Sequence, residues 1–300
     1  MFNFQKNLAV HFIFPGLLVL AALASLVVWG LNMGIDLTGG SLIQVSYNTP
    51  VPTVAQIQSA TAPLNFGEVR VQPTGSAGFI IRTKALSNDE HNQFIAALGH
   101  VGAVHEEEFT TVGPSIGAEL LQKAWIAIGL ALLLIVAFIA FAFRKVSRPV
   151  ASWKYGVVAI IALLFDALIP VGVFAALGHF RGAEVDALFI VALLTILGIS
   201  INDKIVVFDR IRENLSLSHA RGASERFGDI VGRSIRQTLA RSINTSLTVV
   251  IVLVCLYTFG PASTKAFALT LAVGMIVGTY SSIFFASPLL VAWEGWQAKK

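Results

Sequence analysis

Two ionisable residues stand where apolar segments end or begin, and together they could pass ions across a membrane. Asp203 lies at the end of an apolar run that starts at Leu188, and Arg241 opens a later run, RSINTSLTVVIVLV. Ionisable groups in a membrane-spanning helix are costly unless they are paired or face a water path. The two residues therefore indicate an ion pathway, unless both are boundary residues whose side chains reach water at the membrane surface.

Polar side chains that could relay a proton continue from Arg241 along the same segment. Asn244, Thr245 and Thr248 follow it at i+3, i+4 and i+7, and this spacing puts all four on one face of a helix. Water or side chains could carry a proton along this polar stripe. Hydrogen bonds between neighbouring helices need the same residue types, so the stripe could instead serve helix packing.

A second carboxylate, Asp166, lies in the middle of another apolar run, next to Phe165. At that depth it must be protonated, hydrated or paired. An intramembrane aspartyl protease would need Asp166 and Asp203 to meet at one site. It would also need a partner loop such as G-x-G-D, which the sequence lacks. We therefore do not expect an enzyme of this kind.

The sequence offers no local source of chemical energy. It has no G-x-x-x-x-G-K-[ST] phosphate loop and no Cys/His cluster with metal-ligand spacing. The single cysteine, Cys255, cannot form an intramolecular disulfide and should pack as a small apolar residue. We expect no metal and no cofactor, so any work must draw on a partner or an ion gradient.

The elements that position these residues are membrane-spanning helices. Apolar residues make up 55% of the chain and charged residues only 13%, and whole segments exceed the ~18–20 apolar residues that cross a bilayer. We expect a first helical region at residues 1–30 and a five-helix region at residues 123–300. The six spans are predicted at residues 10–30, 125–143, 156–177, 188–208, 243–259 and 267–291, with a loop at residues 209–242.

Lysines and arginines near the ends of the spans predict the orientation of the chain. They are concentrated at Lys6, in the loop after the second span (Arg144, Lys145, Arg148 and Lys154), throughout residues 204–241 and at Lys299–Lys300. These parts should be cytoplasmic, whereas the acidic segment 31–122 should be external. The basic pI of about 9.3 thus reflects topology, and nothing requires a nucleic-acid partner. The basic stretch before Arg241 could also lie on anionic lipid as an amphipathic segment.

Residues 31–122 are predicted to form a small domain of their own. Strands are expected at residues 41–48, 68–71, 78–84 and 104–112, and helices at residues 53–61 and 87–98. The second helix opens with a capping box, Ser87 to Glu90. The order β-α-β-β-α-β is typical of a ferredoxin-like α+β domain.

Two glycine-rich motifs mark the ends of this domain. Gly34-Ile35-Asp36-Leu37-Thr38-Gly39-Gly40 follows the first span, and residues 111–117 (TVGPSIG) lead into the second. The first motif reads as a turn in which Gly39 and Gly40 supply positive φ and Asp36 bonds nearby amides. The second reads as a matching hinge.

Five segments, in order along nearly the whole chain, together resemble the SecF family of protein-export membrane subunits. They are GIDLTGG, TVGPSIG, LGISINDKIVVFDRIREN, RSINTSLTVV and GMIVGTYSSIFFASPLL. The run IND…VVFDRIREN with RSINTS is highly specific, whereas GIDLTGG also suits the sister SecD family. Length favours SecF, because SecD proteins carry a much larger external region.

The resemblance implies a fold and a set of partners. It implies half of a resistance-nodulation-division bundle, a multi-pass protein of the bacterial inner membrane with both termini in the cytoplasm. Such a subunit would pair with SecD and YajC beside the SecYEG channel, contact membrane lipid, and use the proton motive force to move secreted polypeptides. The small residues Gly274, Gly278, Ser281 and Ser282 would offer the partner a close-packing surface. The alternative is a small-molecule or lipid exporter of the same superfamily, although those proteins are usually twice as long.

The resemblance also assigns roles to individual residues. Asp203 and the neighbouring Asn202 match the IND motif, so Asp203 would bind the proton, with Arg241, Asp166, Asn244 and Thr245 as further members of the pathway. Two positions depart from the family pattern. Phe165 stands where a histidine usually precedes the aspartate, and Lys204 stands where a small residue usually follows the IND aspartate. Lys204 could act on Asp203 or extend outward to water.

Overall fold

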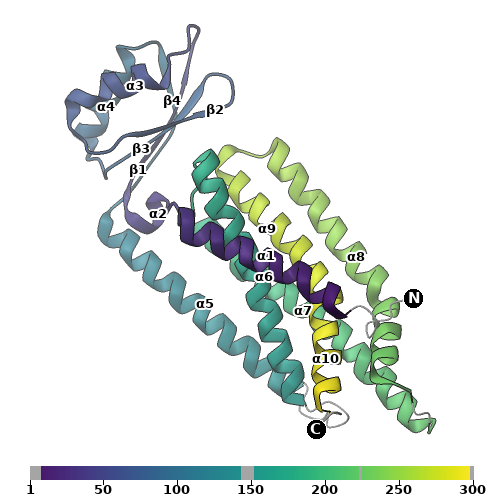
Figure 1. Cartoon of the computed structure of the whole chain (residues 1–300). Helices are drawn as coiled ribbons and strands as arrows, with labels where there is room; N and C mark the ends of the chain where they lie inside the picture. Colours follow the sequence, from purple (N-terminus) through teal and green to yellow (C-terminus); the bar gives the residue numbers. More distant parts are fainter. Residues whose placement is uncertain (1–7, 143–151, 223–224, 298–300) are drawn as a thin grey trace. The chain divides into compact units, whose positions relative to one another are not determined.

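The computed structural model describes residues 8–142, 152–222 and 225–297, and its helices and strands are drawn in Figure 1. The chain divides into two compact units. The α+β unit comprises residues 32–126 and 184–187, and the helical unit comprises the other described residues. Six of the basic residues that predict orientation lie outside the described residues, namely Lys6, Arg144, Lys145, Arg148, Lys299 and Lys300.

The α+β unit has the predicted ferredoxin-like order. A short helix and a 3-10 turn supplement it, and the full set is α2 (Ile35–Thr38), β1 (Gly40–Tyr47), α3 (Val54–Thr61), η1 (Ala62–Leu64), β2 (Arg70–Thr74), β3 (Gly78–Thr83), α4 (Asn88–Gly99) and β4 (Val104–Val112). The four strands form one antiparallel sheet in the order β2-β3-β1-β4. Strand β2 runs through Pro73, where the sequence predicts a break, because β2 is an edge strand and the proline needs no inward N–H donor.

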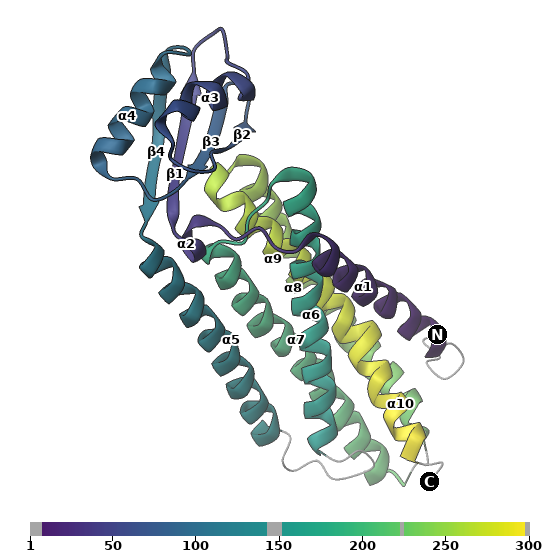
Figure 2. The ribbon, with the colours of Figure 1, turned by 60° about the vertical axis from the view of Figure 1, so that its left-hand side comes forward.

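Alternation along the central strands builds the core of this unit. Ile43, Val45 and Tyr47 of β1 point to the same face as Phe79 and Ile81 of β3. Helices α3 and α4 cover that face, as Figure 2 shows, and contribute Ile57, Phe94 and Leu98. Both helices begin with complete capping boxes, at Thr53 and at Ser87, so the turn residues and the apolar pattern specify the same fold.

Long apolar helices build the helical unit, although the first part of one helix, residues 114–126, and the first residue of another, Ala187, belong to the α+β unit (Figures 1 and 2). They are α1 (Leu8–Trp29), α5 (Pro114–Ala142), α6 (Ser152–Arg181), α7 (Ala187–Ala220), α8 (Phe227–Phe259) and α9 (Ala262–Ser281), which continues through the π-helical turn η2 (Ser282–Ala286) into α10 (Ser287–Gln297). Six segments in the described chain are long and apolar enough to span a membrane. The predicted six-span architecture is therefore confirmed.

The connection at residues 209–242 is mostly helical. Helix α7 continues to Ala220 and α8 begins at Phe227, and Gly222 takes a positive φ of 65° just after the end of α7. The first half of α8 buries Phe227, Ile230, Val231 and Ile235 in one core with residues of α7 such as Phe208 and Ile211. Its apolar side is thus occupied by protein, which differs from the lipid-bound segment that the basic stretch suggests.

Candidate functional site

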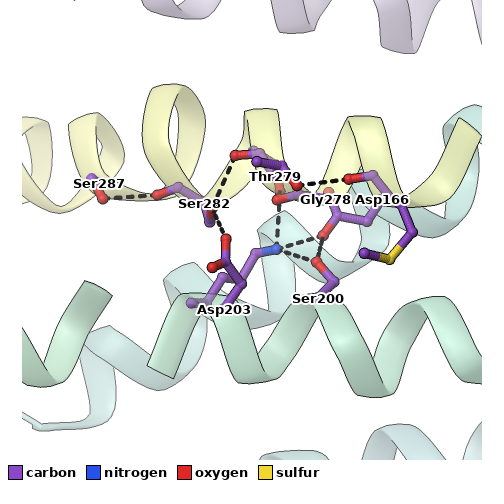
Figure 3. Close-up of polar contacts among 10 residues, drawn as sticks. Asp166, Ser200, Asp203, Gly278, Thr279, Ser282 and Ser287 are labelled. Atoms are coloured by element: carbon purple, nitrogen blue, oxygen red, sulfur yellow. Dashed lines mark hydrogen bonds and ion pairs between the residues drawn. The ribbon is translucent and has the colours of Figure 1, made fainter. Parts of the chain in front are cut away.

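Asp203 lies on α7, and hydroxyl groups from two other elements bind its carboxylate. Ser242 of α8 donates to Asp203 Oδ1 at 2.5 Å, and Ser282, the first residue of η2, donates to Oδ2. Figure 3 shows Asp203 opposite Ser282. The side chain is half-buried. Both donors are neutral hydroxyls, so these hydrogen bonds bring no opposite charge to the carboxylate.

Lys204, the next residue, contributes to a separate polar centre on α7. Its side chain is fully buried, and its Nζ lies 2.5 Å from Asp166 Oδ2 of α6, 2.6 Å from Ser200 Oγ and 2.9 Å from Ser281 Oγ of α9. Asp166 is fully buried as well and also accepts from Ser200 (Figure 3). The expectation that Lys204 extends outward to water is therefore wrong, because its ammonium is buried and forms its ion pair with Asp166.

The junction between α9 and the π-helical turn η2 contributes a side chain to each of the two centres. Ser281 ends α9 and Ser282 begins the π-helical turn, so neighbouring residues reach Lys204 and Asp203 respectively. Ser287 donates to the Ser282 carbonyl at 2.9 Å across this turn. Single π-turns within α-helices are frequent at functional sites, where they redirect side chains.

The small residues of α9 and the first residue of η2 pack within the chain. A Cβ added at Gly274 would lie 2.2 Å from Ile196 Cδ1, and one at Gly278 would lie 3.0 Å from Ser200 Oγ, both on α7. Ser281 and Ser282 are fully buried. The prediction that these four residues form a surface for a partner is therefore wrong. A small-residue pattern allows close helix packing but does not say which helix approaches.

The predicted polar stripe of α8 points away from the site. Arg241, Asn244, Thr245 and Thr248 are exposed on this chain, as is Asn202 of α7. The other side of α8 carries Ser242, which binds Asp203, and Ser246, which is hydrogen-bonded to Thr279 of α9. Neither serine was predicted to belong to the site, although their i, i+4 spacing within RSINTS places both on one helix face.

A small cavity lies beside Asp203, with a volume of about 10 Å³. Ser200, Asp203, Ser246 and Thr279 lie around it together with Ile196 and Met275. This volume is close to the lower limit for one water molecule, but only apolar surface faces the cavity, so the cavity lacks the polar partners that a bound water needs.

The geometry does not favour hydrolytic chemistry. Ser200 and Lys204 lie 2.6 Å apart, but Ser200 Oγ accepts from Lys204 Nζ and donates its own hydrogen to Asp166 Oδ2, whereas the serine of a serine–lysine nucleophile pair donates to the amine. Asp166 and Asp203 have different hydrogen-bond partners. The shared carboxylate site that an aspartyl protease needs is therefore not formed by these two residues.

The glycine motif of the α+β unit binds the segment that connects α6 to α7. Gly34 donates to the Val185 carbonyl at 2.9 Å, Val185 donates to the Asn32 carbonyl at 2.8 Å, and Asp36 Oδ2 accepts from the Ala187 amide at 3.2 Å. Ala187 is the first residue of α7. The partner of Asp36 is thus an amide far along the chain, where the sequence predicts one nearby, and it is a free donor at a helix start.

The two glycine motifs also meet each other. Gly39 has a φ of 81°, and a Cβ there would lie 2.6 Å from Pro114 Cα. A Cβ at Gly117 would lie 2.5 Å from the Gly39 nitrogen. Gly40 has a φ of 143°, as predicted for a turn glycine. The two backbones therefore approach more closely than any residue with a side chain would allow.

An ion pair fixes the same connecting segment to the sheet. Arg82 Nε of β3 lies 2.7 Å from Glu184 Oε2, and the side chains are 17% and 13% exposed. Burial raises the pKa of the Glu184 carboxyl and lowers the pKa of the Arg82 guanidinium, because each charged form loses hydration. The charge of each residue opposes the pKa shift of the other. Either charge can therefore stay buried only while the ion pair is intact.

The chain matches known protein families over most of its length. The family described as protein export membrane protein SecD/SecF, C-terminal, matches residues 93–296, and the SecD/SecF GG motif matches residues 24–51. The protein translocase subunit SecF of Thermobaculum terrenum is 44% identical over 291 residues, which cover 93% of this chain and 89% of the relative.

Longer relatives match with about two fifths of their length. The protein translocase subunit SecDF of Bacillus subtilis is 32% identical over 99% of this chain and 39% of its own length. The crystal structure of SecDF from Thermus thermophilus, described as a translocon-associated membrane protein, is similar with a TM-score of 0.84 and 33% identity. That match covers 98% of this chain and 39% of the crystallised chain.

Proposed function

The chain belongs to the SecD/SecF family of protein-export membrane proteins, and on this premise we propose that it fills the SecF role in a proton-driven translocation complex. It pairs with SecD, and with YajC, beside the SecYEG channel in the bacterial inner membrane. The complex uses the proton motive force to assist the movement of secreted polypeptides, and it needs no cofactor. Both termini lie in the cytoplasm, and residues 31–122 lie outside.

The observation that carries the proposal is the environment of Asp203. Its charged form receives hydrogen bonds from two separate elements, α8 and η2. Hydrogen bonds to a charged group are about twice as strong as those between neutral groups. Protonation therefore weakens the contacts of α7 with both neighbours at once. Proton binding and release can in this way alternate between two packings of the helical unit.

The exposed polar stripe supports a partner within the membrane. A guanidinium and an amide facing hydrocarbon would be costly, and Arg241 and Asn244 are both exposed on this chain. In transporters built from two related halves, the ion site lies at the interface between the halves. The SecDF relatives are more than twice as long as the match to this chain, and their names combine SecD with SecF. We infer that the polar stripe faces the helices of SecD.

The glycine motif supports a route from the proton site to the external domain. Asp36 binds the first amide of α7, and Asp203 lies further along the same helix. A displacement of α7 that follows proton exchange would thus act on the start of the external domain through this hydrogen bond.

The test is the Asp203→Asn variant, with Asp209→Asn as the matched control. Asp209 lies on the same helix but is exposed and paired with Arg212. Vesicles would contain SecYEG and SecD with each version of this chain, and export of a secretory substrate would be followed with and without a proton gradient. We expect Asp203→Asn to assemble normally and to lose the response to the gradient, whereas Asp209→Asn keeps it.

Two outcomes would contradict the proposal. One is a response of Asp203→Asn to the gradient that equals that of the wild type, which would make Asp203 a structural residue only. The other is gradient-dependent export by this chain without SecD. Each proton moved through ~100 mV supplies only about 2.3 kcal/mol, so the measurement must follow many turnovers.

A further inference from the structure

We propose that the Lys204 ammonium is a built-in monovalent cation that fills an intramembrane cation site formed by Asp166, Ser200 and Ser281. This inference goes beyond the proposed function, because cation binding can be measured without any translocation. The charge of Lys204 has no role in the proposed proton mechanism. Lys204 has no exposed surface and forms its contacts with three oxygen atoms.

The hydrogen-bond pattern shows that the centre is arranged for a cation. The ammonium has three N–H donors, and three oxygens surround it at 2.5, 2.6 and 2.9 Å. Ser200 gives its own hydrogen to Asp166 Oδ2, and Ser281 gives its hydrogen to the Gly278 carbonyl. Both hydroxyl oxygens therefore present only lone pairs to the position that Lys204 Nζ occupies.

The charge of the centre selects a monovalent ion. Asp166 supplies one negative charge, which the ammonium balances, whereas a divalent ion would leave a net positive charge buried among apolar residues. Carboxylate and hydroxyl oxygens are hard ligands and suit hard cations such as Na⁺. Asp166 Oδ1 is buried and has no hydrogen-bond partner within the described residues, so a further oxygen is available to an ion that replaces the ammonium.

The consequence for this chain is that one of its two carboxylate centres cannot exchange its cation. The ammonium is attached to α7 and cannot leave, so Asp166 is permanently balanced. If the proposed function is correct, ion exchange by this chain is left to Asp203.

The test removes the ammonium and asks whether a free cation takes its place. The full-length wild type and the Lys204→Ala variant would be purified in detergent, and their thermal unfolding compared in NaCl, KCl and choline chloride at equal ionic strength. We expect the same unfolding temperature for the wild type in all three salts. The variant should unfold at a higher temperature in NaCl or KCl than in choline chloride, and the difference should grow with salt concentration.

The control is the double variant Asp166→Asn/Lys204→Ala, which keeps the cavity but lacks the carboxylate, and we expect it to respond equally to all three salts. If Lys204→Ala cannot be purified in choline chloride, recovery of folded variant in NaCl or KCl would also show that it is stabilised by a free monovalent cation. Stabilisation of the variant by acid alone would overturn the proposal, because a proton on Asp166 would then replace the ammonium. Any result other than a cation-specific stabilisation that depends on Asp166 overturns it as well.

Discussion

At the scale of single residues, two aspartates of the helical unit differ in burial and in the groups that bind them. Asp166 is fully buried and balanced by Lys204, so protonating it would leave a buried ammonium without a counter-charge. Asp203 is half-buried and accepts from two neutral hydroxyls. Two carboxylates whose surroundings differ in this way can serve different roles, and the proposed function gives proton exchange to Asp203.

The fixed pair leads to a prediction about stability. Asp166→Asn removes the carboxylate and leaves the Lys204 ammonium buried and unbalanced. We expect a loss of about 3–5 kcal/mol in the free energy of unfolding, the range measured when one partner of a buried pair is removed. Thermal unfolding of the full chain in detergent measures the effect.

The double variant Asp166→Asn/Lys204→Met provides the control for this prediction. It removes both charges and keeps most of the side-chain volume. It should therefore recover most of the lost stability, because a neutral pair of similar size can replace a buried ion pair at little cost. An Asp166→Asn single variant that unfolds like the wild type would show that Lys204 is not held by this carboxylate.

At the scale of elements, glycines decide how closely two backbones approach. A Cβ at Gly117 would lie 2.5 Å from a backbone nitrogen of the other glycine motif, whereas a Cβ at Gly113 would meet nothing within 4 Å. We expect Gly117→Ala to destabilise the α+β unit by about 1–3 kcal/mol, as overpacking does, and Gly113→Ala to have a much smaller effect. Hydrogen exchange of residues 35–40, followed by mass spectrometry, distinguishes them. Equal exchange in both variants would contradict the close approach of the two motifs.

The start of α4 gives a prediction about pH. The pKa of Glu90 is lowered to about 2, first by its hydrogen bond to Lys84 and then by the Ser87 amide in the capping box. A lowered pKa means that the carboxylate contributes stability above its ordinary value of 4.5, and that this contribution is lost as the pH falls through about 2. The amides of α4 should therefore stay protected at pH ~5 and lose protection on strong acidification.

The titration of Glu90 can be followed directly. In the full chain labelled with ¹³C-glutamate, we expect a midpoint for the Glu90 carboxyl near pH 2. Lys84→Met removes the largest cause of the shift and should move the midpoint upward, toward the ordinary value. A Glu90 midpoint that Lys84→Met leaves unchanged would show that the capping box alone sets the pKa.

At the scale of the whole molecule, the direction of the chain through the membrane decides which parts meet which partner. The bias of lysine and arginine predicts residues 31–122 outside and residues 216–236 inside. Cys255 is exposed on α8 in this chain rather than packed within it, so the labelling background is Cys255→Ser. A cysteine introduced at the exposed Asn88 should react with a membrane-impermeant reagent in intact cells with a permeable outer membrane. Reaction only after the inner membrane is opened would reverse the topology.

Local properties were sufficient to predict much of this protein. Apolar length specified six spans, and the alternation of strands and capped helices specified a ferredoxin-like domain, because each follows from contacts within a few residues. Five short motifs indicated the family, and the matching family models confirm it. Asp203 and Asp166 stand out in the sequence because a charge in an apolar run is costly wherever it faces.

The tertiary structure alone decided what those residues face. The sequence leaves open whether Lys204 acts on its neighbour Asp203 or extends outward to water. Successive residues of a helix point about 100° apart, and Lys204 reaches Asp166 on another helix. Ser242 and Ser282 approach Asp203 from distant segments, and Asp36 binds an amide far along the chain. A sequence records which side chains share a helix face, but the pairing of faces depends on the packing of the whole bundle.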